Sequence, residues 1–325
     1  MLIEVSNLTK KFNSLTAVDD ISFAVEAGEI LVLLGTSGCG KTTTLKMINR
    51  LIEPTFGEIR IKGENVQTQK SEKLRKRIGY VIQNIGLFPH YTVEENIGIV
   101  PNLLNWDKQR ITRRTLELME MVGLPPDDFR KRYPEELSGG QQQRVGLVRA
   151  LAADPPIVLL DEPFGALDPI TRRQIQKEFK TLEMLLNKTI ILVTHDVFEA
   201  FELAVRVCLM DQGKIQQIDS AKEMLFTPKN EFVKDFFQAN RFQLELKVLT
   251  LKDILPEIKP KETSHENIKT FEETTNLLDV LESIEHTSLT QSIFRIKDTR
   301  NNQVVETTSE EVIAAFYKTR SKLSK

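Results

Sequence analysis

Cysteine and histidine are scarce in this chain, which argues against a disulfide-stabilised protein and against a structural metal site. Only two cysteines occur among the 325 residues, Cys39 and Cys208, and they lie far apart. This pair indicates neither a disulfide framework nor a metal site, and it favours a reducing, cytoplasmic compartment. The four histidines are scattered as well, so we expect no structural zinc site.

An excess of one charge and long apolar runs are also missing. The net charge is −2, whereas proteins that bind nucleic acid usually carry a basic excess, so we expect no nucleic-acid partner. No stretch approaches the roughly 20 apolar residues of a membrane-spanning helix. The start, Met1–Glu4, lacks the basic region of a signal peptide. If the protein serves a membrane, we expect it to do so from the cytoplasmic side through a partner.

Glycine is missing from the last third of the chain. All 15 glycines lie at or before Gly213, and beyond about residue 240 the sequence is rich in Glu, Lys and Thr. Apolar periodicity nevertheless continues in three segments of this tail, at 244–255, 276–284 and 292–296. The tail is therefore predicted to be a small folded module rather than a disordered segment. A chain of 325 residues favours about two domains. With the change in composition as the boundary, we place the first domain at 1–238 and the second at 240–325.

Strand-like and helix-like patterns alternate in the first domain. Residues 2–5 and 17–25 alternate between polar and apolar, as half-buried strands do. Continuous apolar runs, typical of buried strands, occupy 30–34, 78–82, 157–160 and 189–193. Helical patterns occupy 112–122, 141–151 and 171–186. We therefore predict an α/β fold with a mostly parallel sheet, whose strands bind ligands at their carboxyl ends.

The segment 35–42 reads GTSGCGKT and matches the pattern GxxxxGK[ST]. It follows a buried strand pattern and precedes a helical one, which is the context of a phosphate-binding loop. Its glycines let backbone N–H groups face an anion, and the next helix adds its positive end. A chance glycine turn is the alternative, and the flanking strand and helix disfavour it. The predicted nucleotide-binding residues of the loop are Gly35, Thr36, Ser37, Gly38, Cys39, Gly40, Lys41, Thr42 and Thr43.

Polar residues also end three other predicted strands. Asp161 and Glu162 follow the run 157–160, while Gln83 and His195 end two more. An Asp in this position can hold Mg²⁺, and the next carboxylate can act on an attacking water. Taken singly, Gln83 and His195 are each more often ordinary hydrogen-bonded polar residues than catalytic ones. For Asp161 and Glu162, an ordinary acidic turn is the alternative, and the phosphate loop upstream disfavours it. One γ-phosphate at the sheet edge would explain all of these strand ends together.

Six motifs in order make the chain resemble the ATPase subunits of ABC transporters from about residue 1 to 238. They are the phosphate loop, Gln83, LSGGQ at 137–141, LLDEP at 159–163, ALD at 166–168 and His195. The resemblance implies a P-loop NTPase with a RecA-like mixed sheet core. It also implies an N-terminal antiparallel β-subdomain and an inserted helical subdomain at about 86–150. The tail adds a small α+β C-terminal module.

The resemblance also implies a role for each motif residue. Phe12, an aromatic residue in the polar turn predicted at 9–12, would stack on the adenine of ATP, and Lys41 would reach its β- and γ-phosphates. Lys41, Glu162 and His195 form the implied catalytic set, with Glu162 as the catalytic carboxylate. The implied Mg²⁺ ligands are Thr42, Gln83 and Asp161. Contacts to ATP held by a second copy are implied for Ser138, Gly139, Gly140, Gln141 and Asp168.

One phosphate loop and one LSGGQ motif per chain imply two copies, arranged head to tail with ATP between them. The resemblance implies an integral membrane permease and a substrate-binding protein as further partners, and ATP and Mg²⁺ as cofactors. Through the permease, the chain would be a peripheral subunit at the cytoplasmic face of the inner (plasma) membrane. The segment 86–97 would dock the permease, and a plain amphipathic surface is the alternative.

Within this family, four segments resemble the importers of osmoprotectants: 46–54, 85–90, 94–97 and 161–170. Those importers carry quaternary amines such as glycine betaine, choline or carnitine. The solute rests on resemblance alone, because no residue of an ATPase subunit is expected to touch it. An importer of another small solute and a soluble, non-transport ABC ATPase are the alternatives. The second usually fuses two nucleotide domains or inserts a long coiled coil, and neither occurs here.

The tail resembles one CBS module over 246–255 and 292–317. A strand at 293–296, a turn at 301–302, an apolar pair at 304–305 and a helix at 310–317 fit its second half. The turn has no glycine, and there is room for one copy where such modules work in pairs. One module per chain implies pairing across the dimer, and an unrelated dimerisation appendage is the alternative.

Overall fold

The computed structural model describes residues 1–83, 86–165, 167–168, 170–172, 175–176, 179, 188–258, 269–285, 293–297 and 304–323. Contacts divide the chain into two compact units, 1–218 and 219–325. The boundary predicted at 238–240 lies later, because helices α10 (Ala221–Phe226) and α11 (Glu231–Gln238) fall in the second unit. The functional domains 1–238 and 240–325 therefore stay a prediction.

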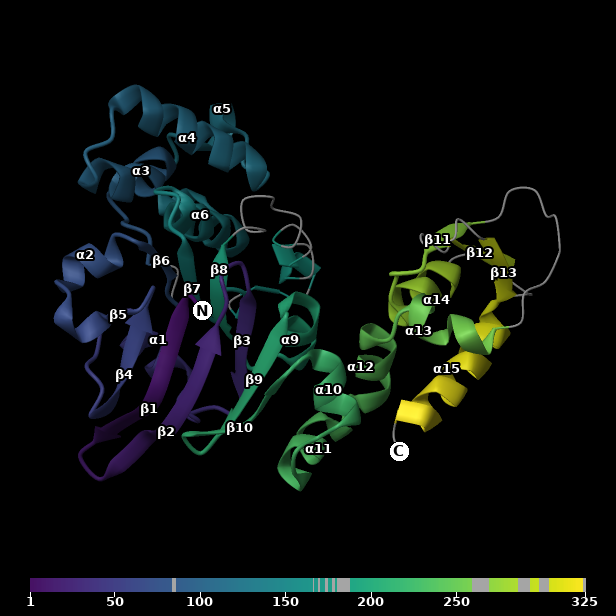
Figure 1. The fold of residues 1–325 in the computed structure, drawn as a ribbon. Helices are drawn as coiled ribbons and strands as arrows, with labels where there is room; N and C mark the ends of the chain where they lie inside the picture. The colour runs from purple at the N-terminus through teal and green to yellow at the C-terminus, as the bar shows by residue number, and fades with distance from the viewer. Residues whose placement is uncertain are drawn as a thin grey trace. The chain divides into compact units, whose positions relative to one another are not determined.

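A six-stranded sheet with the order β10-β9-β3-β8-β7-β6 forms the centre of the first unit (Figure 1). Every residue of β7 and β8 is buried, which explains their continuous apolar sequences. The neighbours β3, β8, β7 and β6 are all parallel, so their carboxyl ends meet at one edge. The strands are β3 (Ile30–Gly35), β6 (Ile78–Val81), β7 (Ile157–Asp161), β8 (Thr189–Val193), β9 (Arg206–Asp211) and β10 (Lys214–Asp219).

An antiparallel sheet with the order β2-β1-β4-β5 packs beside it, as the sequence predicted for the N-terminal region. Its strands are β1 (Ile3–Phe12), β2 (Leu15–Val25), β4 (Phe56–Ile61) and β5 (Glu64–Asn65). Helix α1 (Lys41–Ile48) contacts β2 as well as β3, β7 and β8, so it lies between the two sheets. Phe12, which the sequence placed in a turn, is instead the last residue of β1.

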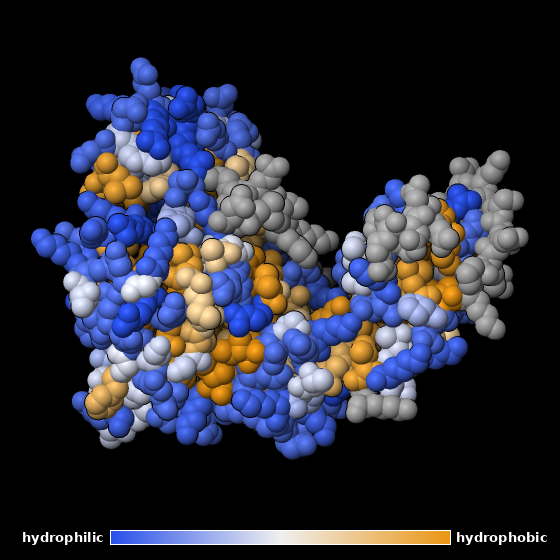
Figure 2. All heavy atoms as spheres, in the orientation of Figure 1, coloured by the Kyte–Doolittle hydropathy of each residue, from blue (hydrophilic) through white to orange (hydrophobic). Residues whose placement is uncertain are grey.

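A helical region lies above the six-stranded sheet in Figure 1. Helix α3 packs against both α4 and α6, and Gly123, with φ of 65°, follows the end of α4. Figure 2 shows mostly hydrophilic residues on the visible face of this region. Its helices are α3 (Val93–Leu103), α4 (Lys108–Met121), α5 (Pro126–Phe129) and α6 (Gly139–Leu151). Two further helices of the unit are α2 (Ser71–Arg75) and α9 (Val197–Leu203).

Most of the helix predicted at 171–186 lies outside the described residues. Among the residues that are described, no helix is both long and apolar enough to cross a membrane.

The second unit has its own core and an α+β fold, which confirms the prediction of a folded tail. Strand β11 (Thr270–Glu272) is parallel to β12 (Ile293–Lys297), and β12 is antiparallel to β13 (Val304–Thr308). Phenylalanines Phe271 and Phe294 meet edge to face in the core, with ring centroids 5.3 Å apart. Its other helices are α12 (Arg241–Val248), α13 (Leu251–Ile254), α14 (Leu277–Glu285) and α15 (Ser309–Leu323). The turn expected at 301–302 lies outside the described residues, and the CBS assignment stays a prediction.

Candidate active site

The loop 36–40 connects β3 to α1, and its backbone conformation explains its glycines. Gly40 has a φ of 103°, and a Cβ atom there would lie 2.5 Å from the carbonyl oxygen of Ala17. Gly38 has a φ of 78° and faces open space, which leaves room for a phosphate to approach the backbone. Cys39 is only 2% exposed, so its side chain contributes to the core rather than to the surface of the loop.

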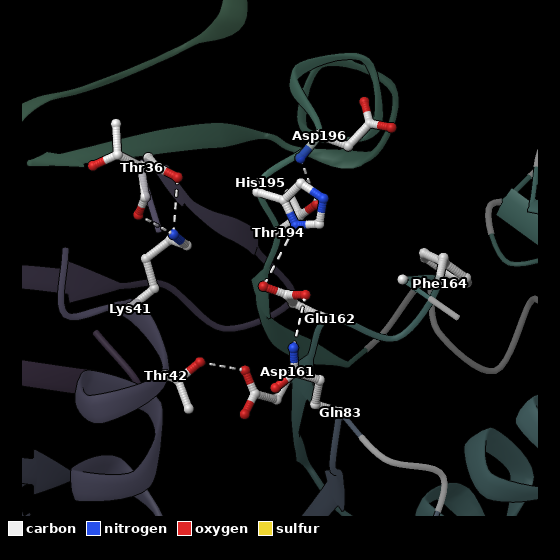
Figure 3. Close-up of polar contacts among 12 residues, drawn as sticks. Thr36, Lys41, Thr42, Gln83, Asp161, Glu162, Phe164, Thr194, His195 and Asp196 are labelled. Carbon is white, nitrogen blue, oxygen red and sulfur yellow. Dashed lines mark hydrogen bonds and ion pairs between the residues drawn. The ribbon is translucent and has the colours of Figure 1, made fainter. Parts of the chain in front are cut away.

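Lys41, the first residue of α1, holds a buried positive charge at the loop. Its side chain is 6% exposed, and its ammonium donates to the carbonyl oxygens of Gly35 and Thr36, each at 2.8 Å (Figure 3). No carboxylate of the described residues forms an ion pair with it. A buried cation that no carboxylate contacts directly favours a bound anion. The position of Lys41 therefore fits the predicted contact with phosphate oxygens.

Thr42 and Asp161 come together from different elements. The Thr42 hydroxyl donates to Asp161 Oδ1 at 2.7 Å. Asp161 ends β7 and is 2% exposed, and burial raises the pKa of its carboxyl group against the opposing effect of the Thr42 hydrogen bond. A hydroxyl and a carboxylate side by side are oxygen ligands of the kind that Mg²⁺ prefers. The two residues therefore fit a magnesium ion.

Glu162 stands at the centre of the strand ends, between Gln83 and His195 (Figure 3). The Gln83 amide donates to Glu162 Oε2 at 3.0 Å, and His195 Nδ1 lies 3.5 Å from Glu162 Oε1. The backbone of Glu162 has a φ of 47°, a left-handed conformation that is strained for a residue with a side chain. The structure thus brings together three predicted residues, with Gln83 contacting Glu162 rather than the Thr42–Asp161 pair.

The residues predicted to contact ATP of a second copy lie apart from this cluster. Ser138 caps α6, where its Oγ accepts from the Gln141 N–H at 3.3 Å and the Gln141 side chain accepts from the Ser138 N–H at 2.9 Å. Asp168 likewise accepts from the N–H groups of Ile170 and Thr171. A hydrogen bond from the Thr171 side chain, which has the largest effect, and these backbone hydrogen bonds lower the pKa of the Asp168 carboxyl group.

Within the described part of the chain, no hydrogen bond or ion pair connects Ser138, Gly139, Gly140, Gln141 or Asp168 with the phosphate loop or Glu162. Phe12 is also separate: its ring is 45% exposed, with the Lys10 ammonium 4.9 Å from the ring centroid. One chain therefore brings together the residues predicted for phosphate, for the metal and for hydrolysis, and leaves the remaining predicted residues on its surface.

Glu199 is a buried acid beside this site that the sequence analysis did not find. It belongs to α9, is 4% exposed, and its pKa is raised to about 8, mainly by burial and then by the nearby Asp196. A hydrogen bond with Thr194 acts in the opposite direction. Its closeness to His195 in sequence was the available signal, but burial of an acid in a short helix cannot be read from a sequence pattern.

Comparisons with known proteins agree with this geometry. The sequence profile described as ABC transporter matches residues 18–165. The chain is 52% identical over 258 residues to the osmoprotectant import ATP-binding protein OsmV of Salmonella typhimurium, which covers 78% of this chain and 68% of the relative. It is 49% identical over 261 residues to the glycine betaine uptake system ATP-binding protein YehX of Escherichia coli, covering 80% and 84%. The chain belongs to the ABC transporter family of ATP-binding proteins.

A further relative and a solved structure also match this chain. The glycine betaine/carnitine/choline transport ATP-binding protein OpuCA of Bacillus subtilis is 54% identical over 225 residues, which are 69% of this chain and 59% of that protein. A solved ATP-binding cassette, a dimer in a post-hydrolysis state bound to ADP and Pi, aligns with a TM-score of 0.61 at 32% identity. That alignment covers 67% of this chain and 98% of the solved chain. The ABC membership identifies the chain as an ATPase that binds nucleotide, and confirms the predicted P-loop NTPase fold.

Replacement of Lys41 by alanine tests the phosphate assignment. We expect Lys41→Ala to weaken ATP binding by about 10- to 100-fold, because a charged hydrogen bond contributes about 1.5–3 kcal/mol. Isothermal titration with ATP measures the change. Lys62→Ala removes an exposed lysine of the same unit and serves as the control with unchanged affinity. Equal affinity of Lys41→Ala and wild type would contradict the assignment.

Glu199 should make the stability of the protein depend on pH. The folded protein keeps the Glu199 proton up to a pKa of about 8, whereas the ordinary value is 4.5. Folding therefore takes up a proton between these values, and raising the pH through this range lowers the free energy of unfolding. In Glu199→Gln we expect a shallower decline over pH 5–8, measured by urea unfolding. An unchanged slope would show that Glu199 is ionised in the folded protein.

Proposed function

We propose that this chain is the ATP-hydrolysing subunit of a membrane importer for quaternary-amine osmoprotectants. The observation that supports hydrolysis is the convergence of Lys41, the Thr42–Asp161 pair and Glu162 at one sheet edge. The proposed solute class follows the relatives, whose names specify osmoprotectant import, glycine betaine/carnitine/choline transport and glycine betaine uptake.

In the proposed ATP site, the backbone of loop 36–40 and the Lys41 ammonium hold the β- and γ-phosphates. The exposed ring of Phe12 stacks on the adenine. Thr42 and Asp161 would hold Mg²⁺, with Gln83 as the third ligand. When bound, the metal neutralises phosphate charge as the γ-phosphate is transferred to water.

Hydrolysis in this proposal depends on Glu162. Its carboxylate orients the attacking water and accepts a proton from it. His195 lies on the Oε1 side of that carboxylate, at 3.5 Å, where it keeps Glu162 aligned and faces the γ-phosphate. Gln83, bonded to Oε2, connects the same carboxylate to the segment that follows at 86–97.

A second copy completes the proposed site. Ser138, Gly139, Gly140 and Gln141 form the exposed or half-buried N-terminal turn of α6, a helix of 13 residues. Helix N-termini bind anions through their N–H groups and their dipole. We propose that this turn contacts the γ-phosphate held by the other copy in a head-to-tail dimer, with Asp168 at the interface. The dimeric solved cassette is consistent with this arrangement.

The membrane permease docks, in this proposal, on the segment 86–97. Phe88 and Tyr91 are 50% and 45% exposed, with ring centroids 5.6 Å apart. The fully buried Asn96 side chain supports this pair, since it bonds to the backbone of Phe88, Tyr91 and Thr92. Through the permease the chain is a peripheral subunit at the cytoplasmic face of the inner (plasma) membrane, and a substrate-binding protein delivers the solute.

An importer of another small solute is the second candidate. Relatives named for spermidine/putrescine import and for sulfate/thiosulfate import are 42% and 45% identical to this chain. The higher identity of the osmoprotectant relatives favours quaternary amines. A soluble, non-transport ABC ATPase has no comparable support.

Glu162→Gln tests the hydrolytic step. Glutamine keeps the size of the side chain but cannot accept a proton, so we expect ATP binding to persist while kcat falls by about 10²- to 10⁴-fold. The variant should also accumulate an ATP-bound dimer, measured by size-exclusion chromatography with ATP.

Glu120→Gln, an exposed glutamate of α4, is the matched control and should hydrolyse ATP normally. Full turnover by Glu162→Gln would exclude Glu162 from the proposed role.

The solute class is tested with the complex of this chain and its permease in proteoliposomes that also contain the substrate-binding protein. We expect glycine betaine, choline or carnitine to stimulate ATP hydrolysis several-fold, because transport and hydrolysis are coupled. Sulfate and spermidine are the comparison solutes. If sulfate or spermidine stimulates ATP hydrolysis and the quaternary amines do not, the proposed solute class is wrong.

A further inference from the structure

The Arg172 side chain connects two loops that border the ATP site. Its Nε donates to the carbonyl oxygen of Phe164 at 3.2 Å, and its Nη2 donates to that of Leu167 at 3.0 Å and, more weakly, to that of Gly165 at 3.5 Å. Its Nη1 lies 3.5 Å from Asp196 Oδ2. All three guanidinium nitrogens are therefore engaged.

The first of these loops connects two predicted site residues. It runs from Glu162, with its strained backbone, to Asp168, the residue expected at the dimer interface. Phe164 anchors the loop, since its ring is 1% exposed and meets Phe179 edge to face at 5.8 Å. Within the loop, the Phe164 carbonyl oxygen accepts from the Leu167 N–H at 3.3 Å. The guanidinium of Arg172 adds donors to this oxygen and to the carbonyl oxygens of Gly165 and Leu167.

The second loop carries His195. Asp196 follows it directly and uses both carboxylate oxygens: Oδ1 accepts from the N–H groups of Phe198 and Glu199 at 2.9 and 3.2 Å, while Oδ2 faces Arg172. The Asp196 N–H in turn donates to the Thr194 hydroxyl at 2.9 Å. The contact of Asp196 with Arg172 therefore acts on the backbone that positions the His195 ring.

These contacts connect Arg172 with Glu162 by two paths. One path runs from Glu162 along its own loop to Arg172, and the other runs from Arg172 through Asp196 and His195 back to the Glu162 carboxylate. A planar guanidinium can serve two carbonyl oxygens and a carboxylate at once, whereas a lysine ammonium acts as a point charge. Such an arrangement restrains both sides of the catalytic carboxylate together.

We propose that Arg172 is a positioning residue for ATP hydrolysis, which holds residues 162–165 and 167–168 and the His195 loop in one fixed arrangement. It touches neither substrate nor metal, and it acts through the orientation of Glu162, His195 and Asp168. This inference rests on the proposed function, because it assumes hydrolysis by Glu162 and dimerisation through Asp168.

The test uses the full chain with Arg172→Ala and Arg172→Lys. A misplaced catalytic group lowers the rate by about 10²-fold, so we expect kcat of Arg172→Ala to fall by about that factor. KM for ATP should stay within about twofold, because the phosphate loop is untouched, and Arg172→Lys should restore only a small part of kcat. Arg132→Ala, which removes a guanidinium bonded to the Asp128 carbonyl oxygen at 2.7 Å, is the matched control with unchanged kcat.

Two further measurements separate positioning from a general loss of structure. In the Glu162→Gln background, Arg172→Ala should weaken the ATP-dependent dimer without weakening ATP binding to the monomer. Asp196→Asn keeps a helix-capping side chain and loses the charge that faces Arg172. Its effect on kcat should largely disappear when it is combined with Arg172→Ala, because both changes break one contact.

Wild-type kcat in Arg172→Ala overturns the inference, and so does a loss of ATP affinity as large as the loss of rate. Fully multiplicative effects of Arg172→Ala and Asp196→Asn overturn it as well. If Arg172→Ala fails to fold, the inference is overturned when Arg172→Lys and Asp196→Asn both keep the wild-type kcat. A wild-type protein without Glu162-dependent ATPase activity overturns the proposed function itself, which is a distinguishable result.

Discussion

The parallel pairing of β3, β8, β7 and β6 is the constraint on which the rest of the site depends. Parallel strands end at the same edge, so residues 79 and 119 positions apart in sequence become neighbours. Thr42 reaches Asp161 and Gln83 reaches Glu162 for this reason alone. β7 and β8 are buried on both faces, so this edge lies on strands of the core of the unit.

Two adjacent carboxylates at the end of β7 have different surroundings and therefore different chemistry. Asp161 is buried against Thr42, and its pKa is raised, which a metal ion would reverse. Glu162 turns into a left-handed backbone conformation that directs its carboxylate toward Gln83 and His195. Strain of this kind persists only where the surroundings hold it, and the contacts of Arg172 with the following loop supply part of that support.

The proposed site needs a second copy of the chain. At the N-terminal turn of α6, Ser138 and Gln141 form a capping box. Ser138 and Gly139 are nevertheless exposed. An exposed helix N-terminus can bind an anionic group, such as a phosphate, that another molecule holds. Membership in the ABC family and the dimeric solved cassette favour a ligand held by a second copy.

The sequence by itself determined the local parts of this protein: the glycine-rich loop, the buried strands and the LSGGQ helix start. Each depends on residues that are close along the chain, through backbone conformation, burial period or capping. Only the tertiary structure decided that Gln83 bonds to Glu162, that Glu199 is buried with a raised pKa, and that Arg172 meets Asp196. It also moved Phe12 from a turn to the end of β1. These features depend on strand order and on packing between distant segments, which local patterns do not encode.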